Sequence, residues 1–123
     1  MPHPIYSDLF LDHFQNPRHV GELPAPAVTV EVSNPVCGDV LRLSALWENG
    51  LVREAAFKAR GCTASIAAGS ALTEWMVGKS REEITAARAA TIEDAVGGLI
   101  PESKHVAVLC VDALKNLLKA IPT

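Results

Sequence analysis

Four side chains in this sequence have the types and positions that metal or sulfur chemistry needs. Cys37 and Asp39 lie two residues apart, between two runs with the alternation of strands. Cys62 follows the second of these runs, and His105 stands at the start of a long helical pattern. Thiolate, imidazole and carboxylate groups together suit zinc or iron. These four residues are therefore the candidate metal ligands.

The segment that carries the first two candidates has the composition of a turn. Pro35 cannot donate to a sheet ladder, and Gly38 permits backbone angles that other residues avoid. We therefore expect a tight, exposed turn from which Cys37 and Asp39 project.

The third cysteine has a different setting. Cys110 lies within an apolar helical stripe, so we expect it to be a small buried residue of the core. A hydrolase that pairs Cys37 or Cys62 with His105 is an alternative, although no pattern indicates an oxyanion hole or a substrate pocket. Three cysteines cannot all pair within one chain, which favours metal or sulfur chemistry over disulfides. The remaining histidines are expected to have surface or packing roles: His3, His13 and His19.

Three runs of period-two alternation predict the strands of one antiparallel meander. Residues 28–33 and 41–47 place apolar side chains on one face, and residues 51–60 continue the pattern after Asn49-Gly50. This dipeptide supplies the positive φ angles of a tight hairpin.

The helical segments follow from apolar spacing and end signals. They are residues 6–14, residues 62–77 closed by Gly78, a short helix opened by a capping box at 80–83, residues 91–96, and a last helix from near Ser103. Cys62 would begin the second helix, where unpaired N–H groups and the helix dipole favour a thiolate. The pattern predicts an α+β fold, with a small three-stranded antiparallel sheet covered by helices, and one domain over residues 1–123.

Composition limits the partners. The chain has 123 residues and a formal charge of −3, and no run of Lys or Arg stands out, which argues against binding to nucleic acid or to an anionic membrane. The first residues have neither the basic start nor the apolar segment of a secretory signal, so a cytoplasmic protein is expected.

Several segments together resemble the IscU/NifU family of iron–sulfur cluster assembly scaffold proteins. They are residues 12–21 (Asp-His-Phe-Gln-Asn-Pro-Arg-His-Val-Gly), residues 34–39 (Asn-Pro-Val-Cys-Gly-Asp), residues 61–70 with Gly-Cys and an Ala/Ser-rich run, and residues 73–80. The resemblance runs along nearly the whole chain.

The resemblance implies a carrier rather than an enzyme. Such a scaffold binds iron, accepts sulfur from a cysteine desulfurase, assembles a transient 2Fe–2S cluster and passes it to apo-proteins. It implies an open site formed by Cys37, Asp39, Cys62 and the start of the last helix, with zinc able to occupy it instead. The sequence leaves homodimer formation open.

The last helix departs from the family pattern. An ungapped match places His105 on the family histidine but Val106 on the third ligand cysteine, and Cys110 follows one helical turn later. Residues 99–104 also differ from the family's Leu-Pro-Pro-Val-Lys chaperone motif. The alternative function is therefore a zinc-bound sulfur acceptor, or a desulfurase-regulating partner, that holds no cluster.

Overall fold

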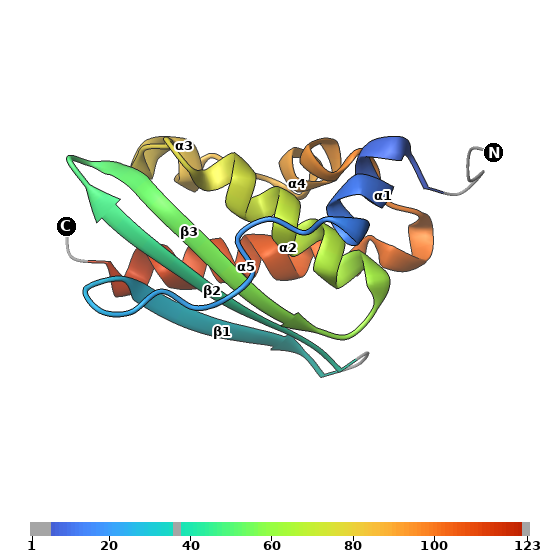
Figure 1. Ribbon diagram of the computed structural model, residues 1–123, viewed down its shortest axis with the longest axis horizontal. Coiled ribbons are helices and arrows are strands. Elements are labelled where there is room, and N and C mark those ends of the chain that lie inside the picture. The colour runs from blue at the N-terminus through green and yellow to red at the C-terminus, as the bar shows by residue number, and fades with distance from the viewer. Residues whose placement is uncertain (1–5, 36–37, 122–123) are drawn as a thin grey trace.

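A computed structural model describes residues 6–35 and 38–121 as a three-stranded antiparallel sheet with helices packed on one face (Figure 1). In chain order the elements are α1 (Asp8–Gln15), β1 (Val28–Asn34), β2 (Asp39–Glu48), β3 (Leu51–Arg60), α2 (Thr63–Met76), α3 (Arg81–Thr85), α4 (Ala89–Val96), a 3-10 turn (Pro101–Ser103) and α5 (His105–Ala120). The predicted α+β fold and its strand order are confirmed.

The sheet follows the predicted alternation. Leu43 of β2 pairs with Phe57 of β3 on one side and with Val30 of β1 on the other, so one face of all three strands is apolar. The hairpin between β2 and β3 turns through Asn49 and Gly50, whose φ angles are 56° and 79°. These positive angles are the ones that the Asn-Gly pair was expected to supply.

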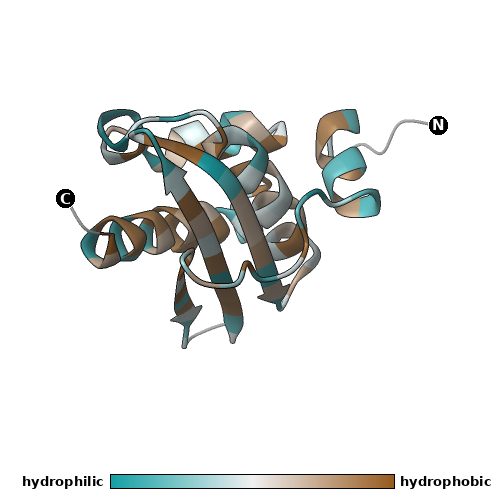
Figure 2. Ribbon diagram, turned by 60° about the vertical axis from the view of Figure 1, so that its left-hand side comes forward, coloured by the Kyte–Doolittle hydropathy of each residue, from teal (hydrophilic) through white to brown (hydrophobic). Residues whose placement is uncertain are grey.

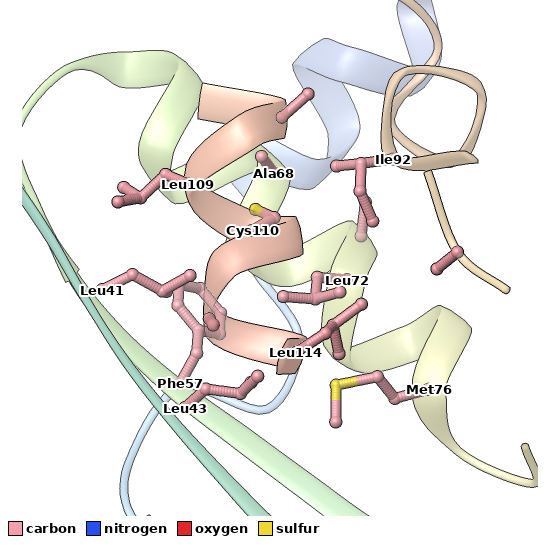
Figure 3. Close-up of a cluster of buried hydrophobic side chains, with 14 of the residues drawn as sticks. Leu41, Leu43, Phe57, Ala68, Leu72, Met76, Ile92, Leu109, Cys110 and Leu114 are labelled. Atoms are coloured by element: carbon pink, nitrogen blue, oxygen red, sulfur yellow. The ribbon is translucent and has the colours of Figure 1, made fainter. Parts of the chain in front are cut away.

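Two helices cover the apolar face of the sheet. α2 packs against β3, and α5 packs against β1 and β2. Side chains from the strands, from α2, from α4 and from α5 meet in one buried cluster (Figure 3). α5 alternates apolar and polar residues along its turns (Figure 2), as a helix with one buried stripe must.

Three helix starts differ from the sequence prediction by two residues. The first helix begins at Asp8 rather than at residue 6. The last helix begins at His105 rather than near Ser103, because Pro101 starts a 3-10 turn first. α4 begins at Ala89, two residues before the predicted start. The predicted capping box of α3 is present, with Ser80 and Glu83 exchanging side-chain and backbone hydrogen bonds.

The start of β2, the start of α2 and the start of α5 meet at one end of the sheet, and this convergence positions the site described below (Figure 1). Among the helices of the described residues, none has the length and apolar character required to cross a membrane.

Candidate metal centre

Asp39 is the central residue of the site. It is the first residue of β2, pairs with Asn34 across the sheet, and is only 2% exposed. The expectation that Asp39 projects from an exposed turn is therefore wrong. Its position at the end of a paired strand holds the carboxylate beneath the surface, where both oxygens are used in hydrogen bonds.

Cys62 contacts this carboxylate twice. The residue is the N-cap of α2, and its backbone N–H donates to Asp39 Oδ1 over 3.2 Å. Its sulfur lies 3.7 Å from Asp39 Oδ2. Because N-terminal N–H groups of a helix lack intrahelical acceptors, the Asp39 carboxylate caps α2 from outside the helix. The prediction that Cys62 begins this helix is confirmed, and the residue is exposed.

His105 completes the group. It is the first residue of α5, its side chain is 32% exposed, and its Nε2 lies 2.9 Å from Asp39 Oδ2. A carboxylate only accepts hydrogen bonds, so Nε2 is the donor here. The metal-binding atoms of Asp39, Cys62 and His105 all lie within 4.8 Å of one another.

This donor set fits a transition metal. A thiolate, an imidazole and a carboxylate are the three ligand types that zinc binds in proteins, and iron accepts the same set. Asp39 is buried while Cys62 is exposed and His105 is half-buried, so the group is open on one side. The arrangement can therefore hold an ion at the surface, where it remains accessible to another protein.

Gly61 makes room for the carboxylate. A Cβ atom at this position would lie 1.9 Å from Asp39 Oδ1 and 3.1 Å from Asp39 Cα, and the backbone φ is 141°. Both observations require glycine, because L residues rarely adopt such an angle and the carboxylate already fills the space. The Gly-Cys dipeptide of the sequence is thus one unit, in which the glycine admits Asp39 and the cysteine binds it.

The other two cysteines do not belong to this group of described residues. Cys37 lies outside the described residues, so its predicted role as a ligand stays a prediction. Cys110 is 1% exposed, and its sulfur lies among apolar side chains between α5 and α2 (Figure 3). Burial raises the pKa of the Cys110 thiol to about 12. Its predicted place in the core is confirmed.

Val106, which stands where the family pattern has its third ligand cysteine, is also buried. Val106 is 1% exposed and belongs to the core cluster, although its neighbour His105 faces the site. Cys110 follows one turn further along α5 and shares this buried side of the helix. Within the described residues, the group that could hold a metal therefore contains one sulfur, that of Cys62.

Ser65 was not predicted as a site residue. Its hydroxyl lies 3.5 Å from the Cys62 sulfur, and the residue is 2% exposed. The signal was available in its spacing, because a side chain three residues after a helix N-cap points back over the first turn toward that cap.

The N-terminal histidines lie elsewhere. His13 is 1% exposed and its Nδ1 lies 2.8 Å from the hydroxyl of Ser70, which also accepts the backbone N–H of Arg18. Burial, and then the charge of Arg18, lower the pKa of His13 below its ordinary value. His19 Nδ1 lies 3.2 Å from the Thr73 hydroxyl. Both histidines thus join α1 and its exit loop to α2, in agreement with the predicted packing roles; His3 lies outside the described residues.

Comparison with known proteins extends this picture. The sequence profile of NifU-like N terminal domains matches residues 5–122. The chain belongs to this family. The iron-sulfur cluster assembly scaffold protein IscU of Azotobacter vinelandii is 43% identical to it over 118 residues, which cover 93% of this chain and 91% of that protein.

A second relative agrees in sequence, and a solved structure shares the fold. A Drosophila melanogaster protein named iron-sulfur cluster assembly enzyme IscU is 38% identical over 122 residues, covering 96% of this chain and 79% of that protein. A crystal structure of a putative iron-sulfur cluster assembly scaffold protein for the SUF system from Fervidobacterium islandicum AW-1 superposes with a TM-score of 0.74. Its sequence identity is 20%, and the match covers 94% of this chain and 98% of that one. This structure shares the fold of the NifU-like chain.

Proposed function

We propose that this protein is an iron–sulfur cluster assembly scaffold. The observation that carries the proposal is the convergence of Asp39, Cys62 and His105 at the open end of the sheet in a member of the NifU-like family. The cluster is cargo, so the protein acts as a carrier rather than as an enzyme that turns over a substrate. Its partners are a cysteine desulfurase, which supplies sulfur, and apo-proteins, which receive the cluster.

Cys37 completes the proposed ligand set of Cys37, Asp39, Cys62 and His105. Two thiolates, one carboxylate and one imidazole bind iron less firmly than a set of thiolates alone, because oxygen and nitrogen ligands are harder donors than sulfur. A transient 2Fe–2S cluster on such a set can leave for an acceptor that offers more cysteines. Asp39 supports this exchange, because its carboxylate hydrogen-bonds His105 in the structure and can take up that contact again when the cluster leaves.

The experiment is anaerobic reconstitution of the protein with iron, cysteine, a cysteine desulfurase and a thiol reductant that converts persulfide sulfur to sulfide, followed by mixing with an apo-ferredoxin. We expect visible absorption of a cluster on the protein and its later appearance on the ferredoxin. Cys62→Ala should form no transferable cluster while keeping its far-ultraviolet circular dichroism spectrum. If the unaltered protein neither absorbs nor transfers, the scaffold proposal is wrong.

A second candidate function is a zinc-bound sulfur acceptor, or a partner that regulates a desulfurase, and that holds no cluster. It is favoured by the burial of Val106 and Cys110, which leaves the site without a third cysteine. Metal analysis with mass-spectrometric mapping of persulfide on Cys37 and Cys62 separates the two. Stoichiometric zinc, persulfide on either residue and no acid-labile sulfide would favour this candidate over the scaffold.

A further inference from the structure

We propose that Ser65 is a positioning residue of the metal centre, which orients the Cys62 sulfur by a hydrogen bond and thereby raises the affinity of the site for a metal. The inference rests on the proposed function, because it concerns the same site. It adds a residue outside the predicted ligand set and gives it a specific role.

The position of Ser65 in α2 directs its side chain toward the sulfur. Ser65 is the third residue of the helix, and its backbone N–H donates to the Cys62 carbonyl over 3.0 Å. At this position the side chain points back over the first turn, toward the N-cap. The hydroxyl and the sulfur therefore face each other at 3.5 Å.

Asp39 leaves the Ser65 hydroxyl available for the sulfur. In a capping box, the side chain of the third helical residue accepts the backbone N–H of the N-cap. In this protein Asp39 Oδ1 accepts that N–H from outside the helix. The Ser65 hydroxyl is therefore not needed as an acceptor for the backbone N–H of Cys62. Its partner in the described part of the chain is the Cys62 sulfur.

Burial makes this contact specific. Ser65 is 2% exposed, so its hydroxyl has little access to water, and a buried donor needs a partner. The hydroxyl hydrogen can satisfy the sulfur and leave a sulfur lone pair for a metal. Asp39 Oδ2 also lies close to this sulfur, 3.7 Å away. Two buried residues from different elements thus restrict the direction in which Cys62 presents its lone pairs.

Such outer contacts matter in metal sites. Groups that hydrogen-bond a ligand hold its orientation, and their loss typically lowers metal affinity by about 10–100-fold. A hydrogen bond to a ligand sulfur also draws charge from it, which changes the electronic transitions between that sulfur and the metal. Both effects are measurable on the metal-loaded protein without any assay of cluster transfer.

The test is Ser65→Ala, with Ser70→Ala as the matched control. Alanine keeps the helix, because it is the best helix former. Ser70 is also a buried serine of α2, but its hydroxyl contacts His13 and the Arg18 backbone rather than Cys62. The probes are zinc affinity, measured by competition with a coloured chelator, and the sulfur-to-metal charge-transfer band of the Co²⁺-loaded protein.

We expect Ser65→Ala to weaken zinc binding by about 10-fold or more and to shift the Co²⁺ band. Ser65→Thr, which keeps the hydroxyl, should restore the band position. Ser70→Ala should lower thermal stability while leaving both metal readouts unchanged. Unchanged affinity and band in Ser65→Ala would overturn the inference and leave the proposed function standing, whereas an unaltered protein that binds neither metal would contradict the proposed function itself.

Discussion

Replacing Gly61 by alanine should damage the site through Asp39. The new Cβ would lie 1.9 Å from Asp39 Oδ1, and because it would also lie 3.1 Å from the backbone Cα of Asp39, rotation of the side chain alone gives only part of the relief. The φ angle of 141° adds backbone strain. Strain of this kind costs about 1–3 kcal/mol, and a buried carboxylate displaced from its donors costs roughly another 1–3 kcal/mol. We therefore expect Gly61→Ala to lower the free energy of unfolding by about 2–6 kcal/mol.

Gly50→Ala is the matched control. Gly50 also has a positive φ, 79°, but a Cβ there would meet nothing within 4 Å. Its cost is backbone strain alone, about 1–2 kcal/mol. The assay is urea unfolding of both variants. Zinc affinity is measured separately by chelator competition in the absence of urea, where each variant is folded. Gly61→Ala should bind zinc at least about 10-fold more weakly than the unaltered protein, since Asp39 moves, and Gly50→Ala should bind normally. Equal costs and equal affinities for the two variants would refute the role given to Asp39.

Three further predictions concern the core and the N-terminal helix. Cys110→Ala should cost about 1–3 kcal/mol in urea unfolding and leave zinc affinity unchanged, because the side chain is buried away from the site; a loss of metal would show that this thiol is a ligand. Gly69→Ala should destabilise the protein by about 1–3 kcal/mol in the same assay, because its Cβ would lie 2.4 Å from the Phe57 ring. In an open helix the same change would stabilise, so an increase in stability would contradict the packing described for α2. The pKa of His13 is lowered from 6.5 by burial, so its protonation favours the unfolded chain, and stability should decline as pH falls below about 6.5. Urea unfolding across this pH range should show a shallower decline in His13→Gln, and identical slopes would contradict the account.

The fold could be predicted from the sequence because its signals are local. The alternation in β1, β2 and β3, the Asn49-Gly50 turn and the apolar stripe of α5 each depend on residues close together in the chain. The same local reasoning placed Cys110 in the core, since a helical stripe identifies the buried side without knowledge of its partner.

The site itself was predicted in part. The convergence of Asp39, Cys62 and His105 was expected, but the burial of Asp39 was not, because it results from pairing with Asn34 and from the space left by Gly61. The contact between Ser65 and the Cys62 sulfur was also missed. The burial of Asp39 depends on the three-dimensional approach of β2 to α2, which no local pattern of the chain expresses. The Ser65 contact lies within the first turn of α2, so its three-residue spacing from Cys62 could have indicated it.

The central claim is that a cluster is built on the group around Cys62, and the most direct measurement is iron and acid-labile sulfide in protein isolated without oxygen after reconstitution. The unaltered protein should be compared with Cys62→Ala and with Cys110→Ala, which removes a thiol buried in the core. We predict equal amounts of iron and sulfide in the unaltered protein and in Cys110→Ala, and neither in Cys62→Ala. Zinc without sulfide in the unaltered protein, or a cluster that persists in Cys62→Ala, would contradict the account.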